Sequence, residues 1–270
     1  MRINVQGADI YAYTGDKAFD AAKPTAIFIH GVLCDHSVWA LQSRYIANHG
    51  WNVLALDLPG HAKSSAAAAP TTVEAAAAFI GQLMDAVGLD KAALIGHSWG
   101  SLIAMQAAAQ LKDRVSHLAL VGTAYPMKVS PALLDSAIKA PDAAIRMINV
   151  FSRATLAPPN GAGSWVFDAG QALGRRVLAS NKDTNLLHTG FSACDNYAGG
   201  EAAMAALACP VLFALGKEDQ MTPAKAAKGL IDAAKAADKR VTVAMLPSGH
   251  NQMTEAPDET LFAIRDFLAR

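Results

Sequence analysis

Short apolar segments alternate with longer helix-like segments along most of this 270-residue chain. Six short, mainly apolar segments predict strands, at 26–29, 53–56, 92–95, 117–121, 211–215 and 241–245. Helix-favouring composition is found at 38–48, 71–87, 99–111, 223–237 and 257–269. Strands that are apolar throughout are typically buried on both faces. Their alternation with helices therefore predicts a mostly parallel, doubly wound sheet that helices cover on both sides.

The start of this pattern and an interruption within it carry further information. Residues 2–5 and 10–13 predict an initial hairpin around Gly7, which gives a sheet of about eight strands. The alternation stops between about 124 and 206, where helix-like pieces are separated by prolines and no buried strand is evident. We therefore expect a core domain of residues 1–123 and 207–270, with a helical cap of residues 124–206 inserted after the sixth strand.

Composition limits the classes of function. The chain is 52% hydrophobic and 17% charged, so it can bury a substantial core. Its 23 basic residues balance 23 acidic ones, which gives no general attraction to nucleic acid or to an anionic membrane. We expect a small-molecule partner, and oligomeric state is not predicted.

The cysteines and the N-terminus indicate the compartment. Cys34, Cys194 and Cys209 are odd in number and widely spaced, unlike a disulfide framework or a zinc site. The first residues lack the apolar stretch of a signal peptide, and no run reaches the ~18 apolar residues of a membrane span. These features predict a soluble, cytoplasmic protein.

Gly96-His97-Ser98-Trp99-Gly100 follows the predicted strand 92–95 and opens the predicted helix 99–111. A G-x-S-x-G sequence between a strand and a helix is typical of a nucleophile elbow. There the tight turn strains the backbone of the central serine, and small flanking residues avoid a clash. The pattern predicts that Ser98 projects above the edge of the sheet.

Two later loops can supply a base and an acid. Asp219 follows the predicted strand that ends at Leu215, and His250 follows the one that ends near Met245. Both residues are expected at the same carboxyl edge as Ser98. A serine hydroxyl needs an imidazole to remove its proton, and the imidazole needs a carboxylate to fix its tautomer.

The chain resembles the α/β-hydrolase superfamily, and within it the lid-containing, carboxylesterase-like serine hydrolases, over about residues 3–268. The motifs that carry the resemblance are His30-Gly31-Val32, Asp57-Leu58-Pro59-Gly60-His61, the elbow, Gly216-Lys217-Glu218-Asp219 and Gly249-His250. The chain order serine, aspartate, histidine is also that of the superfamily.

The resemblance implies roles for individual residues. Ser98 is the expected nucleophile, His250 the base and Asp219 its orienting acid, with Glu218 as the competing acid. The backbone N–H groups of Val32 and Trp99 are the expected oxyanion hole. Such a triad calls for neither a metal nor a cofactor.

Four other residues are expected to have supporting roles. His97 lies on the wrong side of the turn to be the base, and a structural role is expected for it. His30 is expected to bind loop backbone, and Asp57 to cap the turn at Pro59-Gly60. Cys34 is expected to line a pocket. The nearby histidines 30 and 36 do not match a metal-ligand spacing.

Trp99 after the nucleophile also looks like the haloalkane dehalogenase and epoxide hydrolase branch, whose members use an aspartate nucleophile. An ether formed on a serine would resist hydrolysis, so Ser98 favours acyl transfer.

In capped members of this superfamily the insertion covers the triad, which implies an apolar or aromatic acyl pocket here. The large residues of the insertion are Tyr125, Met127, Met147, Phe151, Trp165, Phe167, Phe191 and Tyr197. Any single one of them more often packs the cap onto the core than binds substrate. Arg175 and Arg176 are candidates for binding a carboxylate, although adjacent arginines on a helix diverge and are commonly solvated.

The combined prediction is a serine hydrolase that cleaves carboxylic esters of small to medium, largely apolar substrates through an acyl-enzyme. The same triad also suits hydrolysis of carbon–carbon bonds, lactones, thioesters or amides, and perhydrolysis. A hydrolase-fold receptor with slow or no turnover is the alternative from another class.

Overall fold

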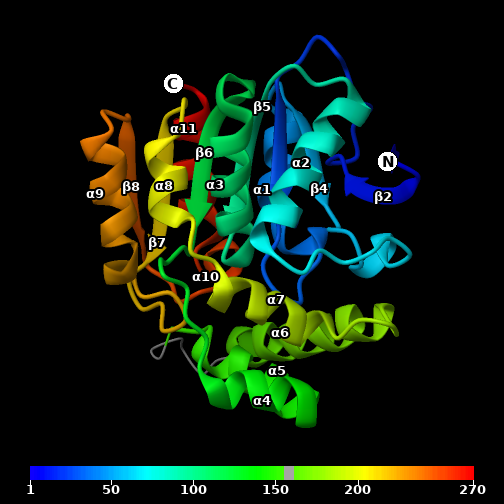
Figure 1. Cartoon of the computed structure of the whole chain (residues 1–270). Helices are drawn as coiled ribbons and strands as arrows, with labels where there is room; N and C mark the ends of the chain where they lie inside the picture. Colours follow the sequence, from blue (N-terminus) through cyan, green and yellow to red (C-terminus); the bar gives the residue numbers. More distant parts are fainter. Residues whose placement is uncertain (155–160) are drawn as a thin grey trace.

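The computed structural model describes residues 1–154 and the backbone of 161–270, with side chains from residue 167 onward. An eight-stranded sheet lies at the centre of the molecule (Figure 1). Its strands are β1 (Arg2–Val5), β2 (Ala8–Tyr13), β3 (Thr25–Ile29), β4 (Asn52–Leu56), β5 (Ala92–His97), β6 (Val115–Val121), β7 (Val211–Gly216) and β8 (Val241–Leu246). Their spatial order is β1-β2-β4-β3-β5-β6-β7-β8. β2 pairs antiparallel with β1 and β4, and the remaining pairs are parallel.

Helices cover both faces of the sheet, as the alternation predicted. α1 (Ala40–Asn48) and α11 (Pro257–Leu268) pack on one face. α2 (Val73–Val87), α3 (Trp99–Leu111) and α9 (Lys228–Ala236) pack on the other. Alternate residues of each central strand feed the two cores, so that Ile27 and Ile29 face one core while Phe28 faces the other. Short helices η1 (His36–Trp39), η2 (Ala62–Ser64), η3 (Lys112–Arg114), η4 (Ala224–Ala227) and α10 (Gln252–Glu255) lie in the connections.

The initial hairpin and the six apolar strands are confirmed, with differences in burial at His117 of β6, which is partly exposed, and along β8. β3, β4, β5 and β7 are buried at every position. β8 was expected to be buried on both faces, but Val243 and Met245 are 43% and 45% exposed. β8 is the last strand of the sheet, so helix coverage is incomplete there.

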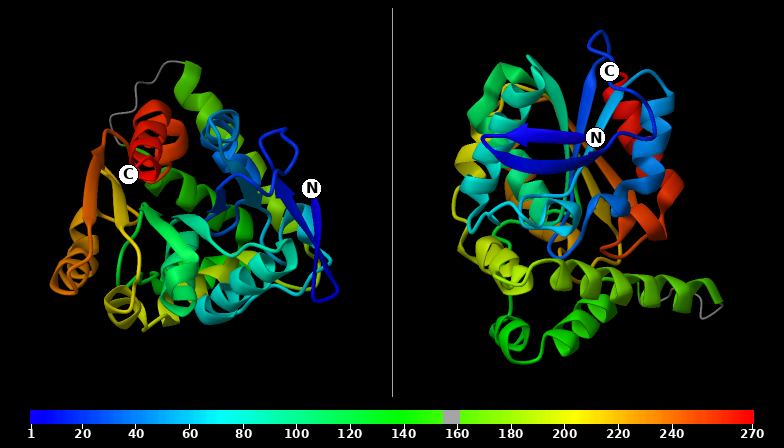
Figure 2. Two further views of the ribbon diagram at one scale, coloured as in Figure 1. Left: turned by 90° about the horizontal axis from the view of Figure 1, so that it is seen from above. Right: turned by 90° about the vertical axis from the view of Figure 1, so that its right-hand side faces the viewer.

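A helical cap follows β6, as expected. It contains α4 (Pro131–Lys139), α5 (Pro141–Phe151), α6 (Gly161–Ser180) and α7 (Leu186–Asn196), and α8 (Gly200–Ala205) precedes β7. Figure 2 shows the cap as a layer beyond the carboxyl ends of the parallel strands. In the described part of residues 122–210 there is no strand. α8 contacts α3 and α9 of the core, so the cap boundaries at 124 and 206 stay a prediction.

The cap has its own small apolar core. Leu133, Ala137, Ile145 and Leu187 pack together, and Leu33 of the core domain joins them. This contact fixes the cap over the loop that follows β3. Among the helices of the described residues, none has the length and apolarity needed to cross a bilayer.

Candidate active site

Ser98 occupies a strained turn between β5 and α3. Its φ is 54° and its ψ is −121°, a backbone conformation that residues other than glycine rarely adopt. The flanking glycines make this turn possible. A Cβ at position 96 would lie 2.1 Å from the Gly100 carbonyl oxygen, and one at 100 would lie 2.4 Å from the Ile29 carbonyl oxygen. The geometry is that of the nucleophile elbow predicted from the sequence.

Asp219 and His250 form a buried pair at the same edge of the sheet. The Nδ1 atom of His250 lies 2.9 Å from Oδ2 of Asp219, and each residue is 5% exposed. Glu218, the competing acid, makes no hydrogen bond with His250 within the part of the chain that the structure describes. The structure therefore brings together the acid and the base that the chain order predicted.

The Asp219 carboxylate stays ionised in spite of its burial. Burial raises its pKa, but the charge of His250 and hydrogen bonds from His250 and Thr222 outweigh burial and leave this pKa below its ordinary value. Oδ1 also accepts the backbone N–H groups of Met221 and Thr222 at 2.9 and 2.8 Å. Such a carboxylate can only accept hydrogen bonds, so Nδ1 of His250 carries a proton and Nε2 is left as a base.

Thr222 and Gln252 were not predicted from the sequence. The Thr222 hydroxyl lies 2.8 Å from Oδ2 of Asp219 and 3.0 Å from Nδ1 of His250. The Gln252 amide donates to the same Oδ2 at 3.3 Å. The spacing Asp219-x-x-Thr222 is typical of a turn in which a carboxylate caps the next backbone N–H groups, and it could have suggested Thr222. No comparable local pattern marks Gln252.

The loop that carries His250 is held from two sides. The Nε2 atom of His97 lies 2.8 Å from the carbonyl oxygen of His250. The backbone N–H of His250 donates to the carbonyl oxygen of Ser152, at the end of α5, at 2.7 Å. Burial, followed by the charge of His250, lowers the pKa of His97 to about 3, so His97 is uncharged at neutral pH. His97 thus contacts the backbone of the predicted base, in agreement with the structural role expected for it.

The two expected oxyanion donors lie next to Ser98. Trp99 is the first residue of α3, where a backbone N–H has no acceptor within its own helix. Val32 follows Gly31, and a Cβ on Gly31 would lie 3.2 Å from Cβ of Ser98. Both backbone segments therefore adjoin the nucleophile, and their role as an oxyanion hole remains a prediction.

Ser98 and His250 open into one cavity of about 210 Å³, which we call the catalytic cavity. Four of the large cap residues line it, namely Met127, Met147, Phe151 and Phe191. Tyr125 and Tyr197 instead pack edge to face at 6.0 Å, away from this cavity. Phe167 lies under the Arg153 guanidinium, and the side chain of Trp165 falls outside the described residues.

His30 and Asp57 have structural contacts. His30 lies 2.8 Å from the Gly31 carbonyl oxygen through Nδ1, and its Nε2 accepts the Leu58 N–H at 3.1 Å. Asp57 accepts the Lys63 N–H at 3.1 Å, which closes the turn that includes Pro59-Gly60. The backbone contacts expected for both residues are present.

Asp35, His36 and Asp57 offer three potential metal-ligand atoms within 4.8 Å of one another. Protein donors already bind these carboxylates. Asp57 accepts both the backbone N–H and the ring Nδ1 of His36, at 2.8 and 2.7 Å. Asp35 pairs with Arg176 at 2.7 Å. The cluster is therefore saturated by internal hydrogen bonds and ion pairs.

Known sequences identify the family. The sequence model of the alpha/beta hydrolase fold matches residues 24–159. The chain belongs to the alpha/beta hydrolase family. Its relatives include the dihydrolipoyllysine-residue acetyltransferase component of the acetoin cleaving system of Cupriavidus necator, 40% identical over 97 residues, which are 36% of this chain and 26% of that protein. An epoxide hydrolase of Caballeronia sordidicola is 34% identical over 108 residues, 39% of this chain and 32% of that protein. These alignments span about a quarter to a third of the relatives' own length.

Solved structures extend the likeness of this alpha/beta hydrolase to the whole fold. The enol-lactonase from Burkholderia xenovorans superposes with a TM-score of 0.83 at 21% sequence identity, and the match covers 100% of both chains. At this identity the likeness establishes the fold.

Proposed function

We propose that this alpha/beta hydrolase is a serine hydrolase that cleaves carboxylic esters of small to medium, largely apolar substrates through an acyl-enzyme. One observation carries the proposal. The strained Ser98 and the buried His250 open into the same cavity, and His250 is held by Asp219 at 2.9 Å. In this proposal Ser98 is the nucleophile, His250 the base and Asp219 the acid that orients it.

The steps follow from the protonation states. His250 Nε2 takes the proton of Ser98 as its hydroxyl oxygen attacks the ester carbonyl carbon, and the charge of Asp219 stabilises the imidazolium. The Val32 and Trp99 N–H groups receive the developing oxyanion, and donors of this kind contribute about 2.7–4 kcal/mol in enzymes where one has been removed. His250 then protonates the leaving alcohol, and water repeats the sequence to release the acid.

The catalytic cavity suits an apolar group of modest size. Its walls include Met127, Leu133, Met147 and Phe191, and its volume is about 210 Å³. Apolar substrate surface gains by leaving water in such a cavity.

The chemistry of serine separates some alternatives. Ring opening of an epoxide by Ser98 would leave an ether that lacks a carbonyl carbon for water to attack. The reaction proposed here is therefore not epoxide hydrolysis, although one relative is an epoxide hydrolase. Lactones are cyclic esters and enter the same mechanism, as do thioesters. Carbon–carbon bond hydrolysis with this triad and slow turnover by a receptor remain the alternatives.

The experiment is hydrolysis of p-nitrophenyl esters of increasing acyl length, together with labelling by a fluorophosphonate. We expect turnover and labelling at Ser98 in the wild type, loss of both in Ser98→Ala, and retention of both in Ser136→Ala on the cap surface. Labelling without turnover of any ester would favour a selective carbon–carbon hydrolase or a receptor. Absence of labelling in folded protein would refute the proposal.

A further inference from the structure

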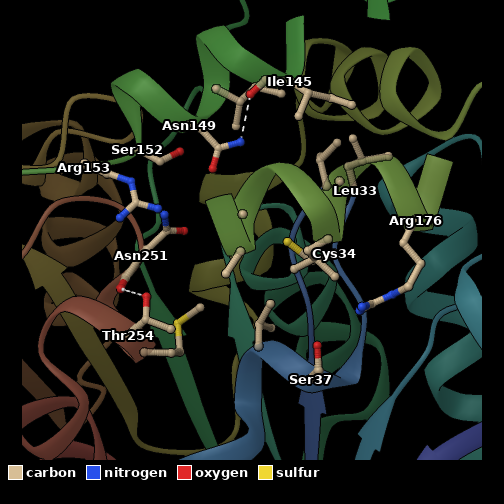
Figure 3. Close-up of a pocket in the computed structure, with 18 residues that line it drawn as sticks. Leu33, Cys34, Ser37, Ile145, Asn149, Ser152, Arg153, Arg176, Asn251 and Thr254 are labelled. Atoms are coloured by element: carbon tan, nitrogen blue, oxygen red, sulfur yellow. Dashed lines mark hydrogen bonds between the residues drawn. The ribbon is translucent and has the colours of Figure 1, made fainter. Parts of the chain in front are cut away.

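A second cavity of about 370 Å³ lies beside the catalytic cavity, and we call it the side cavity. It is enclosed by the loop after β3, the end of α5, α6 and the segment that follows His250 (Figure 3). Ile148 lines both cavities, so they share a wall. Val32, a proposed oxyanion donor, and Asn251, which follows His250 in the chain, line the side cavity. The side cavity and the cavity at Ser98 are therefore neighbours.

Two arginines line the side cavity, whereas the cation among the described residues of the catalytic cavity is Lys128, which pairs with Asp195 at 3.7 Å. These arginines, Arg153 and Arg176, line the side cavity from opposite sides (Figure 3). No carboxylate is present among the described residues that line it. The other polar groups around Arg153 are neutral, and they include Asn149, Ser152 and Asn251. Arg153 and Arg176 are therefore the charged side chains among the described residues that line the side cavity.

Of the two arginines that line the side cavity, Arg153 is the one that makes no ion pair within the described residues. Arg175 forms a two-point ion pair with Asp142 at 2.9 and 3.1 Å, and Arg176 pairs with Asp35 at 2.7 Å. Across the described ranges 1–154 and 167–270, Arg153 has no ion pair, and its buried Nε has no hydrogen-bond partner. Its guanidinium carbon lies 5.7 Å from the centre of the Phe167 ring, within the range of a cation–π contact.

Glu255 is the nearby acid, but its oxygens are already engaged. Oε2 accepts the backbone N–H groups of Ala154 and Gly249 at 3.0 and 3.1 Å, and Oε1 accepts that of Asn251 at 3.2 Å. Burial lowers the pKa of Arg153, and the charge of Glu255 opposes this effect. A partly buried cation without a partner is costly unless a ligand supplies the opposite charge.

Asn149 packs against α6 at the wall of the side cavity. Asn149 is 6% exposed, and its amide N–H donates to the Ile145 carbonyl oxygen at 2.9 Å. A Cβ at Gly170 of α6 would lie 2.1 Å from Oδ1 of Asn149, so glycine at 170 makes room for that amide. The planar fork of a guanidinium matches the two oxygens of a carboxylate.

We propose that Arg153 binds a carboxylate of the substrate in the side cavity, so that the preferred substrates are esters with an apolar part in the catalytic cavity and an acidic group on the other part. This inference rests on the proposed ester hydrolysis at Ser98. It assigns to Arg153 the carboxylate recognition that the sequence had suggested for Arg175 and Arg176.

The test compares two matched pairs of esters, because the acid can lie on either side of the ester bond. Methyl hexanoate is paired with monomethyl adipate, and hexyl acetate with 6-acetoxyhexanoate. In one pair we expect the carboxylate substrate to have at least a tenfold higher kcat/KM, from a rough value for charge-assisted hydrogen bonds. Arg153→Met removes this preference, and Arg153→Lys keeps part of it. Arg175→Met removes the same charge from an exposed, paired position and retains the preference.

The outcomes separate this inference from the proposed function. Neutral esters hydrolysed at Ser98 without preference for the acid in either pair would overturn the inference and leave the proposed function standing. A preference that survives in Arg153→Met, or that Arg175→Met also removes, would overturn it too, because the effect would then belong to the general charge of the cap. Failure of all four esters and of fluorophosphonate labelling would overturn both.

Discussion

Lowering the pH from 7.5 to 5 should destabilise the fold through two histidines that are buried without charge. His61 and His97 are 2% and 3% exposed. Burial is the main cause that lowers the pKa of each imidazole to about 3. The charge of His30 adds to this effect at His61, and the charge of His250 adds to it at His97. In the unfolded chain each has an ordinary pKa of about 6.5. Below pH 6.5 the unfolded state therefore binds protons that the folded state excludes, and stability is lost as the pH falls.

The size of this effect depends little on the folded-state values. For a folded pKa well below 5, each histidine costs RT ln(1 + 10^1.5), or about 2 kcal/mol, at pH 5, and almost nothing at pH 7.5. The two together lower the free energy of unfolding by about 4 kcal/mol. That is a large share of the roughly 5–15 kcal/mol of a typical domain. His30 is also buried with a lowered pKa and adds to the loss in the same direction.

The assay is urea denaturation followed by tryptophan fluorescence at both pH values, in the wild type and in a His61→Asn, His97→Gln double variant. Glutamine at 97 keeps an N–H donor for the carbonyl oxygen that His97 contacts. We expect the double variant to lose about 4 kcal/mol less than the wild type between pH 7.5 and 5, and each single variant about half of that. An equal loss in all four proteins would refute the reasoning.

Three further predictions concern single positions. Thr222→Val removes a hydroxyl that contacts both the acid and the base, so kcat should fall about tenfold with little change in KM; an unchanged kcat would show that the hydroxyl does not position the pair. Gly100→Ala places a Cβ 2.4 Å from a backbone carbonyl oxygen and should cost about 3 kcal/mol or more in thermal or urea unfolding. The control for this change is Gly229→Ala on α9, where a Cβ would meet only Glu201 Oε1 among the described residues, at an ordinary 4.0 Å, and the variant should be neutral or stabilising in the same assay. Burial, with a smaller effect of a nearby carboxylate, raises the pKa of Cys34 to about 12, so iodoacetamide at pH 8 should modify it in urea but not in the native protein, as mass spectrometry would show.

The fold could be predicted because its pattern is local. Each buried strand is an apolar segment of its own, and the order of strands and helices limits the topology. The exception was β8, because whether a strand lies at the edge of the sheet depends on its neighbours and not on its own residues.

The candidate site was predictable to the extent that sequence motifs mark it. Ser98 is the centre of the G-x-S-x-G motif between β5 and α3. Asp219 and His250 each follow a strand that ends at the same edge of the sheet. The contacts that hold them were not predictable, because Gln252 reaches Asp219 and His97 reaches His250 only through the folded chain. Arg153 was missed for the same reason: whether an arginine is paired depends on acids far along the chain.

The hydrogen bond from the His250 backbone to Ser152 ties the base to the last turn of a cap helix. A Cβ on Gly249 would lie 2.5 Å from the Ala154 nitrogen, so the two segments are in direct contact. Any movement that lifts this part of the cap breaks a bond to the catalytic loop. In the proposed mechanism the position of the base therefore depends on the position of the cap, because one hydrogen bond joins the end of α5 to the backbone of His250.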